Sequence, residues 1–146
     1  MTTLMDIVRM NGRAVCATGP HAMVSDAVES MCEKHVRALL VGELAEPVGI
    51  ICERDILERV IRQKRDPEKT PVEAAMTKPL VSLPQDSSPS DALAFMRQHK
   101  LHQVPIVSEE AVVGVVSSTD LMRWATRSQE DDIRALTDYC SGKYPG

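Results

Sequence analysis

The chain is poor in aromatic side chains, which make up 3% of its 146 residues. A core with so few rings must be built from aliphatic side chains and from the eight methionines, which fill irregular gaps. No apolar run approaches the roughly 18 residues that a membrane-spanning helix needs. The first residues, MTTLMDIVRMNGR, lack the basic start and apolar run of a signal peptide. We therefore expect neither a membrane segment nor a signal peptide.

Clusters of basic residues are also missing. The net charge is −4, and lysine and arginine form no long run. Nucleic-acid binding relies on clustered basic side chains that neutralise phosphates. The sequence therefore does not predict DNA or RNA as a partner.

The spacing of the four cysteines excludes the common metal and redox motifs. No CxxC pair is present, and no Cys/His set has zinc-site spacing. A chain of this length can bury a core without disulfides, so we expect free thiols in a reducing cytoplasm. A GxxxxGK phosphate loop is absent, and no nucleophile with a partner base can be assigned. The sequence thus predicts neither a metal site nor an enzyme. The cysteines are Cys16, Cys32, Cys52 and Cys140.

What the chain does contain is an internal repeat. A shift of 65 positions, without gaps, places residues 25–27 (SDA) on 90–92 (SDA) and Asp55 on Asp120. Between these identities, apolar residues fall on apolar residues. Each copy predicts a βαββα unit, with Ser25 or Ser90 as the candidate N-cap of its first helix. Strands are expected over residues 13–18, 38–41 and 48–52, and over 79–83, 104–107 and 112–117.

The repeat defines the expected domain organisation. The first unit spans residues 6–62, a charged linker with a proline spans 63–70, and the second unit spans 71–127. Residues 128–146 are predicted to form an acidic helix and a tail. Because each unit is too small to bury enough surface alone, we expect an α+β fold in which the units pack sheet against sheet. A pseudo-twofold axis then relates them and leaves a cleft on each side.

The repeated element with chemical potential is Gly–apolar–apolar–x–x–x–Asp, over residues 49–55 and 114–120. It lies at a predicted strand-to-helix junction, and a helix N-terminus suits a phosphate. A carboxylate one turn in, at Asp55 or Asp120, can accept hydrogen bonds from two vicinal hydroxyls, as on a ribose. The competing interpretation is that each aspartate only stabilises its first helical turn, by about 0.3–1 kcal/mol. Repetition at the same offset favours a ligand site.

Four stretches together carry a resemblance to a known family. They are residues 72–77 (VEAAMT), 101–107 (LHQVPIV), 114–120 (GVVSSTD) and 49–55 (GIICERD). In this order, and duplicated, they resemble a tandem pair of CBS (cystathionine-β-synthase) domains, also called a Bateman module, over roughly residues 6–124. The resemblance implies two clefts that bind adenosine-containing ligands, and a homodimer.

The resemblance also implies roles for individual residues. Asp120 or Asp55 would hold ribose hydroxyls, and Ser117 and Thr119 would contact ribose or phosphate. Cys52 stands where the family usually has Ser or Thr, which weakens the Asp55 cleft, and Arg54 would partly compensate as a phosphate partner. Phosphate contacts are further expected from Arg37 and His102. The adenine would lie against the backbone near Cys16 and Ala38 in the Asp120 cleft, which Arg37 would also serve, and near Val81 and Gln103 in the Asp55 cleft. Two simpler interpretations stay open, in which Arg37 is an exposed strand-end charge and His102 caps a carbonyl.

Three functional hypotheses follow. The first is a regulatory, ligand-sensing module that binds an adenine nucleotide such as AMP, ADP or ATP, requires no cofactor, and signals to an effector protein or through its own oligomer. The second is a structural or interaction module with vestigial clefts, which the Cys52 substitution supports. The third, an enzyme acting on nucleotides or thiols, lacks an acid, base or nucleophile with a nameable partner.

Overall fold

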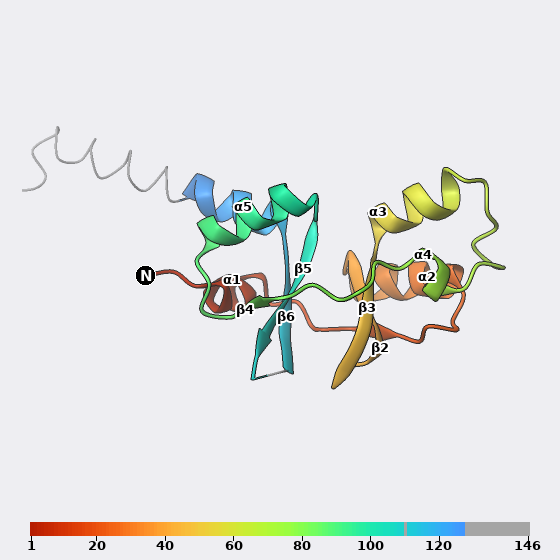
Figure 1. Cartoon of the computed structure of the whole chain (residues 1–146), viewed down its shortest axis with the longest axis horizontal. Coiled ribbons are helices and arrows are strands. Elements are labelled where there is room, and N and C mark those ends of the chain that lie inside the picture. Colours follow the sequence, from red (N-terminus) through yellow and green to blue (C-terminus); the bar gives the residue numbers. More distant parts are fainter. Residues whose placement is uncertain (110, 128–146) are drawn as a thin grey trace, which may run out of the picture.

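The computed structural model describes residues 1–109 and 111–127, and it consists of two halves with the same order of elements (Figure 1). The first half contains β1 (Ala17–Thr18), α2 (Val24–Lys34), β2 (Ala38–Glu43), β3 (Glu46–Cys52) and α3 (Glu53–Ile56), which continues into a π-helical turn, η1 (Leu57–Ile61). The second half contains β4 (Leu83–Pro84), α5 (Pro89–His99), β5 (Gln103–Ser108), β6 (Ala111–Ser117) and a helix over residues 118–127. A short helix precedes each half: α1 (Leu4–Asn11) and α4 (Val72–Ala75). The predicted α+β class is confirmed.

Both sheets have the same topology and the same register. The middle strand pairs in parallel with the short first strand and antiparallel with the third, in the orders β1-β2-β3 and β4-β5-β6. Ala38 pairs with Cys52, and Gln103 pairs with Ser117 at the equivalent place 65 residues later. The repeat found in the sequence is therefore a repeat in the fold.

Some local predictions were wrong. The first strands are only two residues long instead of spanning 13–18 and 79–83. The first helices begin two residues earlier than expected, so Met23 and Ser88 are the N-caps, not Ser25 and Ser90. Ser88 takes this role because Pro89 is well suited to the first helical position, while the Ser88 hydroxyl accepts a hydrogen bond from the Asp91 N–H at 3.1 Å. The predicted linker, 63–70, consists of turns and irregular backbone, and the predicted acidic helix lies outside the described residues.

The two short helices exchange places. In α1, the buried residues Leu4, Ile7 and Val8 belong to the core of the second half. In α4, Val72 and Ala75 belong to the core of the first half. Figure 1 shows α1, in red, beside β6, and α4, in green, beside α2. Each half therefore completes its core with a helix that lies in front of the other half in the sequence.

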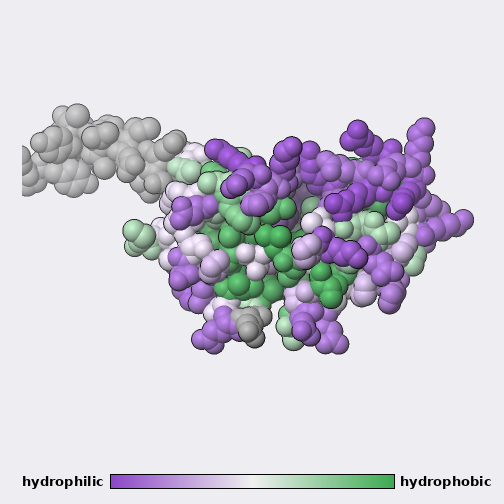
Figure 2. Space-filling model, in the orientation of Figure 1, coloured by the Kyte–Doolittle hydropathy of each residue, from purple (hydrophilic) through white to green (hydrophobic). Residues whose placement is uncertain are grey.

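A third core joins the halves through their sheets. Its buried members, Ala38, Leu40 and Ile50, come from the first half, and the partly buried Val112 and Val115 of the second half pack against them. Burial of apolar area at about 25 cal/mol per Å² holds the two sheets together. Figure 2 shows apolar surface gathered near the seam between the halves, with hydrophilic side chains around it. Among the helices of residues 1–109 and 111–127, none combines the length and apolarity that a bilayer crossing requires.

Candidate functional site

A groove of about 260 Å³ opens between the two halves, where both strand-to-helix junctions face each other. The first residues of α3 and of the 118–127 helix, Glu53 and Ser118, both line it. The groove thus receives the N-terminal ends of two helices, which carry partial positive charge. Its lining consists of Arg37, Cys52, Glu53, Arg54, Leu57, His102, Gln103, Ser117, Ser118 and Thr119.

The same backbone hydrogen bond fixes both junctions. The Glu53 N–H donates to the carbonyl of Arg37 at 3.2 Å, and the Ser118 N–H donates to the carbonyl of His102 at 3.0 Å. These bonds tie the start of each helix to the residue just before the middle strand. As a result, Arg37 and His102 occupy equivalent positions at the rim of the groove.

Both aspartates are buried, with 9% of their surface exposed, and both close a cap on their own helix. The Cys52 N–H donates to Asp55 Oδ2 at 2.9 Å, and the Ser117 N–H donates to Asp120 Oδ2 at the same distance. A buried carboxylate needs such donors to offset its lost hydration. The capping role considered from sequence is therefore present in the structure, in addition to the position beside the groove.

Around Asp55, the remaining contacts come from the segment just after α4, from the end of β3 and from η1. The Thr77 hydroxyl donates to Asp55 Oδ1 at 2.9 Å, and the Cys52 thiol lies 3.2 Å from Asp55 Oδ2. Arg59 Nη1 lies 3.9 Å from Asp55 Oδ1. Burial, reinforced by the Asp55 carboxylate, raises the pKa of the Cys52 thiol to about 11. Cys52 is thus a protonated thiol at neutral pH and a poor nucleophile.

Around Asp120, the environment differs because the carboxylate forms an ion pair with an arginine guanidinium. Arg13, two residues beyond α1, forms an ion pair with Asp120 Oδ2. Asn11 Nδ2 lies 3.4 Å from the same oxygen. The Asp120 N–H donates to the Ser117 hydroxyl at 3.1 Å, so this hydroxyl is already used in the helix cap.

Asp55 lines a larger cavity than Asp120, which lines one of about 90 Å³ together with Asn11 and Arg123, and a third, narrow slot lies in front of Arg13. The cavity beside Asp55 measures about 240 Å³, and His102 and Gln103 cross from the second half to line it. The slot in front of Arg13 measures about 20 Å³, which is room for about one water molecule. Its lining consists of Arg13, Ala14, Cys16, Val36, Arg37, Ala38, Gln103 and Val115.

Most of the expected binding residues come together at three cavities, which are the groove, the slot and the Asp55 cavity. Cys16, Arg37 and Ala38 share the slot, as expected, but Gln103 lines the slot, the groove and the Asp55 cavity rather than the last alone. Val81 and Asp120 line none of the three, and Asp120 lines a fourth cavity, between α1 and the 118–127 helix. Sequence reasoning missed Arg13. The available signal was its register, because a shift of 65 places Arg13 on Lys78, another basic residue.

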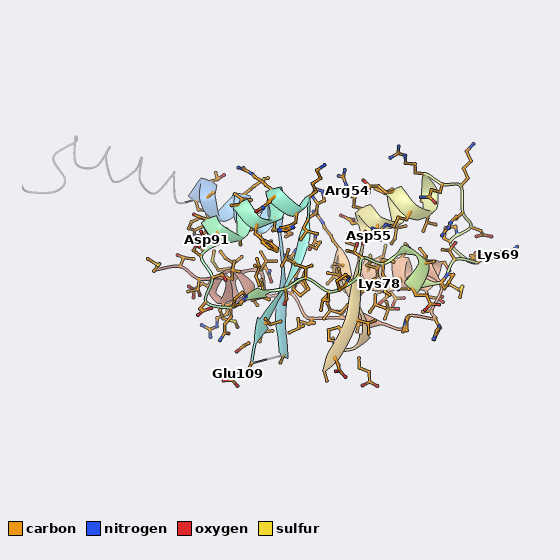
Figure 3. All side chains as sticks on the ribbon, viewed as in Figure 1. Arg54, Asp55, Lys69, Lys78, Asp91 and Glu109 are labelled. Carbon is orange, nitrogen blue, oxygen red and sulfur yellow. The ribbon has the colours of Figure 1, made fainter. Side chains whose placement is uncertain are left out.

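The cations at the groove are paired only at the surface. Arg37 Nε lies 3.8 Å from Glu53 Oε1, and Arg54 Nε lies 2.9 Å from Glu58 Oε1. All four side chains are at least half exposed. Ion pairs at exposed positions contribute about 0–1 kcal/mol to stability. Both arginines can therefore turn to an anion at little cost. Figure 3 shows Arg54 and Asp55 near the start of α3, at the seam between the halves.

The described residues contain no group of three or more His, Cys, Asp or Glu side chains arranged to hold a metal ion. The arrangement supplies two carboxylates, flanking cations and two helix ends around connected cavities. Such a set can bind a polar ligand that carries both hydroxyls and a negative charge.

Comparisons with known proteins agree with this geometry. The family model described as CBS domain matches residues 5–62 and 72–127. The CBS domain-containing protein YhcV of Bacillus subtilis is 35% identical over 107 residues, which cover 73% of this chain and 76% of that protein. The mitochondrial CBS domain-containing protein CBSX3 of Arabidopsis thaliana is 29% identical over 98% of this chain and 74% of its own length. A solved protein with CBS domains from Burkholderia ambifaria superposes with a TM-score of 0.80 at 29% identity, covering 88% of this chain and 96% of that one.

Proposed function

Because the chain belongs to the CBS-domain family and carries two such domains in tandem, we propose that it is a regulatory module that binds adenosine-containing nucleotides between its halves. One observation carries this proposal. Two buried aspartates, at equivalent positions of the repeat, lie at helix starts that open on one cation-lined groove. Ribose hydroxyls and phosphate together are the ligand groups that this combination suits.

In the proposed complex, each ligand lies across the seam. Asp55 and Asp120 accept hydrogen bonds from ribose hydroxyls, and the adenine lies against the backbone near Cys16 and Ala38 on one side and near Gln103 on the other. The phosphates extend into the groove. There they meet Arg37, Arg54, His102, the Ser117 and Thr119 hydroxyls and the N–H groups of both helix starts.

Occupancy would be transmitted by a change in how the halves pack. The halves meet through the mostly apolar seam formed around Ala38, Leu40 and Ile50. A ligand that prefers one packing shifts the population towards it, by no more than its difference in affinity for the two states. The recipient is either an effector protein or a second copy of the chain.

We further propose a homodimer formed through the helical faces. Leu57 and Met122, at equivalent positions of the two halves, are 59% and 51% exposed. Val28 and Ile61 are also exposed, and an apolar hollow of about 480 Å³ lies between α2 and α3. Exposed apolar patches of this kind mark association sites.

Analytical ultracentrifugation of the wild type should give a dimer, and the double variant Leu57→Glu with Met122→Glu should give a monomer. A wild-type monomer would contradict this assignment.

The binding proposal is tested by calorimetry on protein that has been freed of co-purified nucleotide. AMP, ADP and ATP should bind, and Asp55→Ala together with Asp120→Ala should abolish binding. Asp26→Ala is the matched control, because Asp26 lies in the first turn of a helix but is exposed and lines neither the groove nor the Asp55 cavity. Absence of binding by any of the three nucleotides up to millimolar concentration would refute the proposal. Mass spectrometry of the small molecule that co-purifies would identify the ligand.

A second candidate function is an interaction module whose clefts are vestigial. It is favoured by the fact that both carboxylates are already satisfied inside the chain, Asp55 by Cys52 and Thr77 and Asp120 by Arg13. This alternative predicts purified protein without excess absorbance at 260 nm. It also predicts that no adenine nucleotide raises the temperature of unfolding.

A further inference from the structure

The two clefts are chemically unequal, and Arg13 causes the difference. In the first half, the Asp55 carboxylate adjoins a cavity of about 240 Å³, and its arginine neighbour, Arg59, lies 3.9 Å away. In the second half, Asp120 lines a separate cavity of about 90 Å³ beside α1, and Arg13, in direct contact with Asp120, lines a slot of about 20 Å³ between the halves. An adenine ring cannot enter a space that holds about one water molecule.

Arg13 is well placed to hold this closed state. Its side chain is 30% exposed, whereas that of Asp120 is 7% exposed, so the pair lies at the edge of solvent with the carboxylate inside. A charge-assisted bond between a guanidinium and a carboxylate is stronger than a neutral hydrogen bond. Removal of Arg13 would leave the carboxylate with Asn11 and the Ser117 N–H as its remaining donors.

The slot continues towards the site of the phosphates. Arg37 and Gln103 line both the slot and the central groove, so the two spaces adjoin at these residues. A phosphate placed beside Arg37 therefore lies at the end of the slot that Arg13 also lines. Such an anion gives the Arg13 guanidinium an alternative partner, while an uncharged nucleoside gives it none.

We infer that Arg13 is a specificity-determining residue that keeps the Asp120 cleft closed to nucleosides and admits only ligands with a phosphate. This inference rests on the proposed binding of adenosine compounds. A phosphate draws the guanidinium from Asp120, and the freed carboxylate accepts the ribose hydroxyls. An uncharged adenosine must break the ion pair without compensation, so it enters only the Asp55 cleft.

The first half supplies a matched control. Lys78 occupies the position equivalent to Arg13 in the repeat, but it is exposed and does not line the Asp55 cavity. It is labelled in Figure 3 on the segment that follows α4. Lys78→Met removes one positive charge from the matched position, just as Arg13→Met does, without touching a carboxylate contact.

The test is the binding stoichiometry of adenosine and of AMP, measured by calorimetry on the full chain. Wild type and Lys78→Met should bind one adenosine and two AMP per chain. Arg13→Met should bind two adenosines, and its preference for AMP over adenosine in the Asp120 cleft should fall by about tenfold, which corresponds to about 1.4 kcal/mol. Arg13→Gln, a more conservative variant, should change the stoichiometry in the same direction.

The outcomes separate the two claims. If wild type binds two adenosines with equal affinity, or if both Arg13 variants bind only one adenosine, the proposed role of Arg13 is wrong. Either result leaves the proposed nucleotide binding intact. Failure of both adenosine and AMP to bind any of these proteins would overturn the proposed function as well. Crystal structures of the wild type soaked with adenosine or with AMP give a second test that does not depend on a variant. Contact between Arg13 and Asp120 should persist with adenosine and break with AMP, and a contact that persists with AMP bound beside Asp120 would refute the inference.

Discussion

Gly114 in β6 lies so close to Val8 in α1 that a Cβ atom at position 114 would stand 2.5 Å from Val8 Cγ1. The contact joins the start of the chain to the last strand of the second half. At the equivalent position of the first half, a Cβ on Gly49 would stand 2.7 Å from the carbonyl oxygen of Thr77, just after α4. The glycine of each repeated element therefore makes room for the segment that crosses over from the other half.

Gly114→Ala should consequently destabilise the protein. The added methyl group collides with Val8, whose side chain is buried, and overpacking of this kind costs about 1–3 kcal/mol. Gly19→Ala is the control, because a Cβ there would have no neighbour within 4 Å. Urea unfolding of the three proteins gives the free energies. Equal stability of the two variants would show that α1 does not pack as described.

Leu4→Ala tests the exchange of helices more directly. Leu4 is fully buried in the core of the second half, so its truncation should cost about 2–5 kcal/mol. Met10, on the same helix, is 55% exposed, so Met10→Ala should cost less than about 0.5 kcal/mol. Hydrogen exchange should accelerate first in β5 and β6. Faster exchange in β2 and β3 instead would show that α1 packs on the first half and would contradict the exchange of helices.

The thiol of Cys52 should react slowly with alkylating agents at neutral pH. Its pKa is about 11, so on the order of 10⁻³ of the thiol is ionised at pH 8. Cys32, which is exposed, is the internal control. Peptide mass spectrometry after timed iodoacetamide treatment should show rapid labelling of Cys32 and slow labelling of Cys52 that accelerates as the pH approaches 11.

The same shift makes folding depend on pH. The thiol titrates near 9.0 in the absence of the protein environment and near 11 in the folded chain. Its contribution to stability is therefore fully present below pH 9 and is lost as the pH rises through 11. The difference in unfolding free energy between wild type and Cys52→Ser should follow this course, and a pH-independent difference between pH 8 and pH 11 would contradict it.

Cys52→Ser should also improve the Asp55 cleft. A hydroxyl is a stronger donor and acceptor than a thiol, so it caps the helix better and adds a polar contact for ribose or phosphate. We expect AMP to bind this cleft about threefold to tenfold more tightly, which corresponds to about 0.7–1.4 kcal/mol. Cys32→Ser, outside the linings of the groove and the Asp55 cavity, should leave the affinity unchanged. Weaker binding by Cys52→Ser would show that the thiol is the favoured group here.

The repeat predicted most of the fold because hydrophobic class, unlike identity, is kept at the buried positions. Strands β2, β3, β5 and β6 and the two groove-facing helix starts follow from apolar runs that end at Glu53 or Ser118. The first strands are shorter than predicted because each pairs with only one strand and makes just two residue pairs. A strand of two residues is too short to show an alternating hydrophobic pattern, so its length could not be predicted from the sequence.

The repeat register singled out Asp55 and Asp120, which lie at the same offset in the two units. Arg37 and His102 were expected from the family resemblance, and the structure places both on the lining of the groove. The role of Arg13 was not predicted, because its partner lies 107 residues away and the contact depends on α1 crossing to the second half. Gln103 faces three cavities for a related reason, since its place at the seam is set by the packing of both sheets.

The crossing of α1 and α4 has a consequence for any cleavage between the halves. A cut within residues 63–70 leaves an N-terminal fragment that still holds the partner's α1 and a C-terminal fragment that still holds the partner's α4. Each piece lacks part of its own interior and carries the missing part of the other. A nicked chain should therefore remain a single particle in native solution, held by complementation, although it contains two polypeptides.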